Sequence, residues 1–168
     1  AVGMRFDDRV TGDVKTYATQ AKVIHIEIDP AEINKIIKAD VAINSDAKGA
    51  LVSLINKVKP SSHTAWLAEF RVCDQIEYEK ITSKEFYPES DGLKMAEVVK
   101  MLSDKTEGKA VIVTDVGQHQ MVASRYYQFR DKRQNVTSGG LGTMGFALPA
   151  SMGARLGQHD KTVVAIIG

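Results

Sequence analysis

The sequence has one cysteine, four prolines and no long hydrophobic run. Cys73 cannot form a disulfide within the chain, which fits a reducing compartment. No apolar run approaches the roughly 18 residues that a membrane-spanning helix needs. An excess of one charge is also missing: 22 basic residues face 21 acidic ones, so nothing favours binding to nucleic acid or to a lipid surface. We therefore expect a cytoplasmic protein with neither of these partners.

Short β-branched runs alternate with helix-like segments along the sequence. The runs that predict strands lie at 23–28, 41–43, 110–115, 135–138 and 162–167. The segments that predict helices lie at 46–58, 63–82, 93–103, 119–130 and 146–156, and Asp29-Pro30 is expected to start a further short helix. Strands that alternate with helices indicate an α/β fold, with parallel sheets flanked by helices in two Rossmann-like layers.

Polar stretches separate the two predicted layers. KPSS at 59–62 ends the first layer, and the polar residues 83–92, which include Pro88 and Gly92, predict a linker. The domain boundary is therefore expected within 60–90. The sequence opens on AVGMRF and stops on TVVAIIG, a pattern typical of a buried parallel strand, so we expect it to be a piece of a longer protein.

Residues 138–150 (SGGLGTMGFALPA) are the most informative stretch. Four glycines fall within seven positions, directly before an apolar helix-like run. Glycine lets the backbone turn tightly and lie close against a ligand. The start of the following helix is expected to offer free N–H groups to an anion such as a phosphate. Met144, inside the turn, fits either packing beneath a flat ring or an ordinary core position.

A second polar motif, Asp115-Val-Gly-Gln-His119, follows a predicted strand. Open parallel sheets bind ligands outside the carboxyl ends of their strands. Gly117 permits close approach there, and Gln118 and His119 can hydrogen-bond a polar ligand. On this motif alone, a loop histidine without a functional role is an equally good interpretation.

The N-terminal third carries charges that suit a nucleotide. Arg5, Asp7, Asp8 and Arg9 are suited to phosphates and ribose hydroxyls, or they form solvated ion pairs. Glu27 ends a strand, where dinucleotide-binding folds place a ribose-binding carboxylate. His25, within that strand, is expected to be packed, and Ser45-Asp46 is explained as a helix N-cap.

Four segments together resemble one family in order and approximate spacing. GMRFDDRVTG, VIHIEIDPAEI, DVGQHQM and SGGLGTMGFALPA resemble the large catalytic subunits of acetohydroxyacid (acetolactate) synthases, which are thiamine-diphosphate enzymes. RFDDRVTG is the specific part, since other thiamine-diphosphate enzymes share the glycine turn but not this run. The resemblance implies that residues 1–58 are the second half of a central FAD-binding domain, 59–90 a linker with a helix, and 91–168 the start of a thiamine-diphosphate-binding domain.

The same resemblance implies which residues bind the cofactors. For FAD they are Gly3, Arg5, Asp7, Arg9, Val10, Glu27, Ile28, Ser45, Asp46 and Ala47. For thiamine diphosphate they are Gly117, Gln118, His119, Gly142, Thr143 and Met144, with Met144 holding the cofactor in its bent shape. Arg9 also matches an arginine near the substrate entry, and no catalytic residue is expected within the chain. Ser45 and Glu27 depart from the family, which usually has glycine and aspartate there.

The activity implied by the resemblance is decarboxylation of pyruvate and condensation with a second 2-keto acid, pyruvate or 2-ketobutyrate, in branched-chain amino acid biosynthesis. The enzyme would use thiamine diphosphate, Mg²⁺ and FAD, as a homodimer or higher oligomer with a regulatory small subunit. The family's activating glutamate would precede Ala1 and its magnesium motif would begin at Gly168, so the chain alone is expected to be inactive. Two alternatives stay open: another thiamine-diphosphate enzyme, such as a pyruvate oxidase or glyoxylate carboligase, and a non-catalytic nucleotide-binding module.

Overall fold

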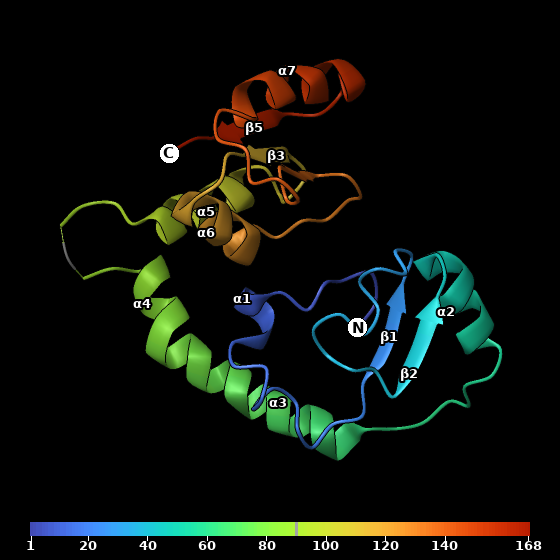
Figure 1. The fold of residues 1–168 in the computed structure, drawn as a ribbon. Coiled ribbons are helices and arrows are strands. Elements are labelled where there is room, and N and C mark those ends of the chain that lie inside the picture. Colours follow the sequence, from blue (N-terminus) through green and yellow to red (C-terminus); the bar gives the residue numbers. More distant parts are fainter. Residues whose placement is uncertain (90) are drawn as a thin grey trace. The chain divides into compact units, whose positions relative to one another are not determined.

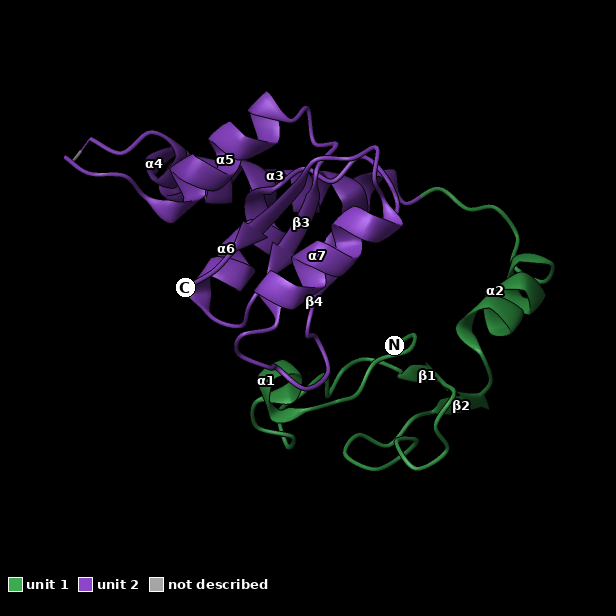
Figure 2. Ribbon diagram, turned by 90° about the horizontal axis from the view of Figure 1, so that it is seen from above, with its two compact units in different colours: residues 1–62 green, residues 63–168 purple. Residues whose placement is uncertain are grey.

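The computed structural model describes residues 1–89 and 91–168, which divide into two compact units, residues 1–62 and residues 63–168 (Figure 2). Each unit has its own parallel sheet and its own helices (Figure 1). This arrangement confirms the predicted α/β fold. Ser90, the last residue of the predicted linker 59–90, lies outside the described residues.

Unit 1 is built on two parallel strands. Strands β1 (Ile24–Glu27) and β2 (Val41–Asn44) pair so that Ile24 lies opposite Val41 and Glu27 lies opposite Asn44. Helix α1 (Asp8–Thr11) precedes them, and helix α2 (Ala47–Ile55) follows β2. Glu27, Asn44 and the start of α2 therefore lie at the carboxyl edge of this sheet.

The prediction of a short helix after Asp29-Pro30 is wrong. Residues 30–34 form turns and residues 35–37 a bend. Asn34 has a φ of 60°, a left-handed conformation that ends any right-handed helix, and its side chain accepts a hydrogen bond from the N–H of Ala39 at 2.9 Å. The asparagine thus stabilises a loop where the aspartate and proline alone predicted a helix.

Unit 2 contains a sheet of three parallel strands in the order β4-β3-β5. Its elements are α3 (Thr64–Glu77), the π-helical turn η1 (Tyr78–Thr82), α4 (Ser83–Phe86), α5 (Met95–Lys105), β3 (Val111–Thr114), α6 (Gln118–Tyr126), β4 (Asn135–Thr137), α7 (Ala147–Gly157) and β5 (Val163–Ile166). The central strand β3 is buried along its whole length, as its apolar sequence predicts.

Helices cover both faces of this sheet (Figure 1). Ile112 points to the face where α5 and α6 pack, and Val111 and Val113 point to the face where α7 packs. Successive side chains of a strand alternate between faces, so a continuous apolar run is what a strand with two covered faces requires.

The prediction of a linker at 83–92 is wrong for its first four residues, which form the helix α4. Phe86 packs edge-on against Tyr126, with ring centroids 5.0 Å apart, and Glu85 accepts a hydrogen bond from the Tyr126 hydroxyl. Burial and this bond raise the pKa of the Tyr126 phenol. The contacts of two side chains with α6 therefore extend the helical stretch into a polar sequence.

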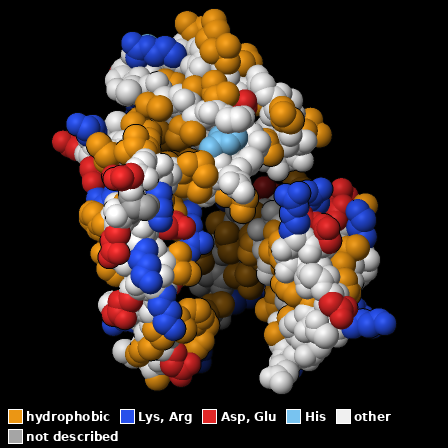
Figure 3. All heavy atoms as spheres, turned by 90° about the vertical axis from the view of Figure 1, so that its left-hand side faces the viewer, with side chains coloured by type: hydrophobic (Ala, Val, Ile, Leu, Met, Phe, Trp, Pro, Cys, Tyr) orange, Lys and Arg blue, Asp and Glu red, His pale blue; other side chains and the backbone are white. Residues whose placement is uncertain are grey.

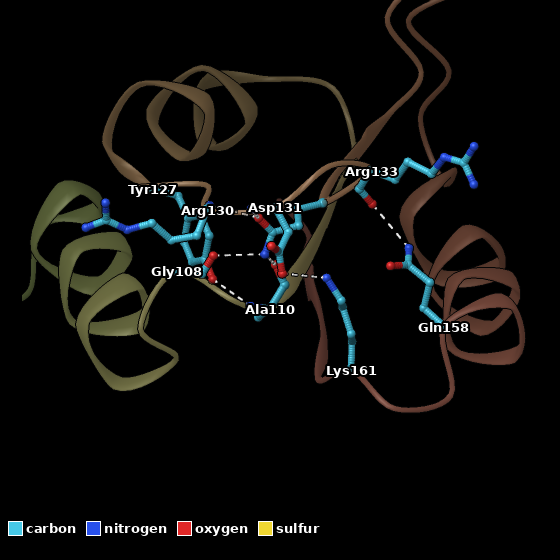
Figure 4. A network of polar contacts seen from close by, with 9 residues as sticks. Gly108, Ala110, Tyr127, Arg130, Asp131, Arg133, Gln158 and Lys161 are labelled. Atoms are coloured by element: carbon cyan, nitrogen blue, oxygen red, sulfur yellow. Dashed lines mark hydrogen bonds and ion pairs between the residues drawn. The ribbon is translucent and has the colours of Figure 1, made fainter.

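A buried glutamine, Gln134, joins the loops at the amino edge of the sheet. Figure 4 labels the residues that it joins, Gly108 and Ala110 on one side and Arg130 and Asp131 on the other. The Nε2 group of Gln134 donates to the carbonyls of Gly108 and Ala110, at 2.8 and 3.0 Å. Its Oε1 atom accepts from the N–H groups of Arg130 and Asp131, at 2.9 and 2.5 Å. One side chain therefore satisfies four backbone groups that come from two separate segments.

Many large apolar side chains stay exposed, and Figure 3 shows how widely they spread over one face. None of the residues of α3 is buried, although Trp66 and Phe70 stack edge-on with centroids 4.9 Å apart. Uncovered apolar area of this kind is typical of surfaces that meet further protein.

Candidate functional site

Segments far apart in the sequence meet at the carboxyl edge of the three-stranded sheet. Thr114, the last residue of β3, lies opposite Thr137 of β4 and Ile166 of β5. The Thr137 hydroxyl accepts hydrogen bonds from the Thr114 hydroxyl at 3.1 Å and from the Gln120 side-chain amide at 2.7 Å. The loop after β3 and the glycine turn after β4 therefore start side by side.

Asp115 ties these two segments together. The residue is only 6% exposed, and its carboxylate accepts a hydrogen bond from the N–H of Ala147, the first residue of α7, at 2.5 Å. Pro149, two residues on, has no N–H to offer. One N–H at the start of this helix is therefore already bonded to a carboxylate of the protein, and the anion site expected there stays a prediction.

The N-terminus of α6 provides donors at the same edge. Gly117 is its N-cap, and the N–H groups of Gln118 and His119 belong to the first turn, where they have no intrahelical acceptor. Gln118 is exposed. This end of α6 fits the polar-ligand role predicted for the motif.

The imidazole of His119 lies close to two glycines. A Cβ atom would fall 2.9 Å from its Cε1 atom if placed on Gly117, and 2.8 Å from its Nδ1 atom if placed on Gly168. The ring also lines an apolar pocket of about 490 Å³ between α5 and β5. Within the described residues its buried Nε2 atom has no hydrogen-bond partner. The Nε2 atom of His119 is therefore a buried polar atom at the sheet edge without a hydrogen-bond partner among the described residues.

The glycine turn is closed by Ser138. Its carbonyl accepts from the N–H of Gly142 at 2.9 Å, and its hydroxyl accepts from the N–H of Thr143 at 3.0 Å. Met144 is 81% exposed, so an ordinary core position is excluded for it. A Cβ on Gly142 would lie 3.9 Å from Cγ1 of Val116, which places the turn beside the loop after β3. The structure thus brings the two predicted motifs together and leaves the methionine accessible.

We expect Gly142→Ala to lower the free energy of unfolding by about 1 kcal/mol, because Gly142 has a φ of 64° and the added methyl group meets no close atom. Gly140→Ala is the control. The backbone at Gly140 is not in the left-handed conformation and an added Cβ would meet no atom, so this variant should be as stable as the unchanged chain. Urea unfolding followed by circular dichroism measures both. Equal stability of the two variants would contradict a conformational requirement at Gly142.

The charged residues predicted for unit 1 lie around α1. The side chains of Arg5 and Asp7 approach each other to 3.9 Å; Arg5 is exposed and Asp7 is half-buried. The Asp7 side chain accepts a hydrogen bond from the N–H of Val10, which caps α1. Arg9 and Val10 lie on that helix and are also exposed. The segment from Arg5 to Val10 therefore places charged side chains and backbone groups at the surface of unit 1.

The other predicted residues of unit 1 lie at the sheet edge. Glu27 is 8% exposed, and its carboxylate accepts from the N–H groups of Ile28 and Asp29, at 2.8 and 3.1 Å. Asp46 accepts from the N–H groups of Lys48 and Gly49, which confirms the N-cap interpretation, and Ala47 begins α2. The Ser45 hydroxyl donates to the carbonyl of Asp46 at 3.1 Å. Each carboxylate thus bonds the backbone with one oxygen and retains a second.

The sequence analysis included Asp115 and Ser138 as the first residues of the two motifs but missed their roles at the edge of unit 2. Each stands directly after a strand and begins a glycine-containing motif. A carboxylate or hydroxyl at that position often bonds the backbone of the following turn, which is the signal that was available.

Within residues 1–89 and 91–168, no group of three or more histidine, cysteine, aspartate or glutamate side chains is placed to hold a metal ion. None of the helices described there is long and apolar enough to cross a bilayer.

Comparison with known proteins matches both ends of the chain to domains of one enzyme class. Residues 1–54 match the model of the thiamine pyrophosphate enzyme central domain, and residues 115–168 match that of the C-terminal TPP binding domain. The second match covers both motifs that meet at the edge of the three-stranded sheet.

Individual relatives match the whole chain. The acetolactate synthase large subunit of Lactococcus lactis subsp. lactis (strain IL1403) is 43% identical over 99% of this chain and 28% of its own length. Acetolactate synthase 2, chloroplastic, of Nicotiana tabacum is 43% identical over 100% of this chain and 26% of its own length. The acetolactate synthase large subunit of Corynebacterium glutamicum is 44% identical over 100% of this chain and 27% of its own length. The chain thus spans less than a third of each of these relatives. It is homologous to acetolactate synthase large subunits along its whole length, and its two ends match domains of thiamine pyrophosphate enzymes.

Proposed function

We propose that the whole protein containing this chain is the large subunit of an acetolactate synthase. It would decarboxylate pyruvate and join the remaining two-carbon unit to pyruvate or 2-ketobutyrate, in branched-chain amino acid biosynthesis. The observation that carries this proposal is the meeting of residues 115–119 with the turn 138–145 at one sheet edge, inside the segment that matches a TPP binding domain.

The residues at this edge fit thiamine diphosphate. The N–H groups of Gln118 and His119 and the side chain of Gln118 would hold the diphosphate, with Gly117 allowing close approach. The unpartnered Nε2 atom of His119 supplies a further polar contact. Gly142, Thr143 and the exposed Met144 would lie against the rings. When bound, the cofactor supplies the electron sink that decarboxylation needs.

Unit 1 would belong to an FAD-binding domain covering residues 1–58, with 59–90 as linker and 91–168 as the start of the diphosphate-binding domain. The exposed guanidinium groups of Arg5 and Arg9 suit the flavin's pyrophosphate, and Arg9 also suits a substrate carboxylate. The free carboxylate oxygen of Glu27 suits ribose hydroxyls. The remaining proposed FAD contacts are Gly3, Asp7, Val10, Ile28, Ser45, Asp46 and Ala47. Mg²⁺ is proposed as a further cofactor of the whole protein, and none of the residues named here is assigned to it.

The proposed assembly is a cytoplasmic homodimer or higher oligomer with a regulatory small subunit. The names of the relatives as large subunits support the second partner. The uncovered apolar side chains of α3 and α6 support contact with further protein.

The proposal is tested by incubating the whole protein with pyruvate, thiamine diphosphate, Mg²⁺ and FAD without oxygen. We expect acetolactate to form while the flavin absorbance stays that of oxidised FAD. The 168-residue chain under the same conditions should form none. Bleaching of the flavin without acetolactate would instead identify a pyruvate oxidase, and acetolactate formed by the chain alone would contradict the assignment of essential groups to other parts of the protein.

A further inference from the structure

The buried imidazole of His25 contacts the segment that carries the proposed flavin residues. Its side chain has no exposed surface, although it belongs to a two-stranded sheet with an accessible edge. The Nε2 atom lies 3.0 Å from the carbonyl oxygen of Met4. Its ring also meets the ring of Phe6 edge-on, with centroids 5.0 Å apart. Two residues within the run Gly3–Val10 therefore contact one side chain of β1.

The backbone of this run leaves the sheet just before the histidine contact. Val2 forms a parallel bridge with Ile26, and the N–H of Gly3 donates to the carbonyl of Ile26 at 2.8 Å. Gly3 has a φ of 58°, which turns the chain away from the strand. The bond from His25 to Met4 is the next one along the chain, so it fixes the direction in which the run departs.

The position of one ring proton follows from the hydrogen-bond partner of Nε2. A carbonyl oxygen can only accept, so Nε2 carries the proton and donates it. The Nδ1 atom is buried, and no hydrogen-bond partner for it is found in the part of the chain that the structure describes. Burying a polar atom without a partner costs stability, which an aliphatic residue of similar size would avoid. The directional bond to Met4 is what an aliphatic residue could not supply.

We propose that His25, donating a hydrogen bond from Nε2–H, is a positioning residue that holds the run Gly3–Val10 on β1 and thereby orients Arg5, Asp7 and Arg9. This inference rests on the proposed function only where it concerns flavin. The placement of the run itself stands on the hydrogen bond to Met4 and the contact with Phe6.

Limited digestion of the folded chain by trypsin tests the placement. Cleavage after Arg5 and Arg9 is measured by mass spectrometry, with cleavage after Lys132 in unit 2 as the internal reference. His25→Leu removes the donor, and His25→Gln keeps an N–H donor at a similar distance from the backbone. Ala50→Gly weakens the buried face of α2 without touching the run, so it is the control for general destabilisation of unit 1.

We expect His25→Leu to raise cleavage after Arg5 and Arg9 about tenfold relative to Lys132, which is the effect of losing one hydrogen bond on a local opening equilibrium. His25→Gln and Ala50→Gly should stay within about threefold of the unchanged chain. Unchanged cleavage in His25→Leu, an equal rise in His25→Gln, or an equal rise in Ala50→Gly would overturn the proposal.

Two further measurements keep the test decisive. If His25→Leu does not fold, long-range ¹H–¹⁵N spectra of the unchanged chain decide: a proton on Nε2 is expected, and a proton on Nδ1 overturns the proposal. In FAD titrations of the whole protein followed by flavin fluorescence, His25→Leu should weaken binding about tenfold and His25→Gln much less. Absence of FAD binding by the unchanged whole protein would contradict the flavin assignment of unit 1, while the digestion result would still decide the role of His25.

Discussion

Replacing Gln134 by leucine is expected to lower the free energy of unfolding of unit 2 by about 3 kcal/mol. The leucine fills much of the same volume but offers no hydrogen bonds. It would remove the side-chain partner of the buried Ala110 carbonyl and of the Asp131 N–H, and it would leave the buried Gly108 carbonyl with only the Arg130 N–H. The loss exceeds that of a typical substitution because four bonds of one buried side chain disappear together (Figure 4).

Gln128→Leu is the matched control, since Gln128 is an exposed glutamine in the neighbouring loop and should change stability by less than about 0.5 kcal/mol. Urea unfolding, together with hydrogen exchange of the β3 amides, measures both variants. An effect of Gln134→Leu no larger than that of Gln128→Leu would show that the amide network does not stabilise unit 2.

Removing the carboxylate of Asp115 is expected to cost about 2 kcal/mol in Asp115→Ala. The buried N–H of Ala147 would lose its acceptor, and the start of α7 would lose a negative charge that its dipole favours. Asp115→Asn keeps an oxygen at the same place and should lose about half as much. Because the same bond joins the loop after β3 to the glycine turn, Asp115→Ala should also move the amide resonances of residues 142–144.

The control for this series is Asp160→Ala, in an exposed turn of the same unit. It should leave both the urea midpoint and these resonances unchanged. Equal stability of Asp115→Ala and Asp115→Asn would mean that acceptance of the Ala147 N–H contributes little.

Most strands and helices could be predicted from local patterns, because the two faces of each element have different surroundings. The run VIVT predicted a covered strand, and the spacing of Val98, Val99 and Leu102 predicted a helix. Both elements are confirmed, although within that helix Val99 is buried while Val98 stays exposed. The wrong predictions are those in which the conformation or contact of one residue overrides the local sequence pattern. Asn34 adopts a left-handed conformation that replaced a predicted helix, and Phe86 packs on α6 from within an apparently polar linker.

The candidate site could be predicted only in part. Glycine spacing indicated that residues 138–145 form a tight turn, and the position of Gly117 after a strand indicated a sheet-edge loop. Their neighbourhood depends on β3 lying between β4 and β5, which no local pattern contains. The same holds for Asp115, whose acceptor role requires Ala147, and for Gln134, whose partners lie in two separate loops.

The central claim is that residues 117–119 and 142–144 together receive thiamine diphosphate. Titration of the ¹⁵N-labelled chain with thiamine diphosphate, with Mg²⁺ present throughout, tests it through the amide shifts in ¹H–¹⁵N spectra. We predict that both segments shift together while unit 1 stays unchanged, and that thiamine without its diphosphate leaves residues 117–119 unmoved. Shifts confined to other parts of the chain, or a response of one segment without the other, would contradict the account.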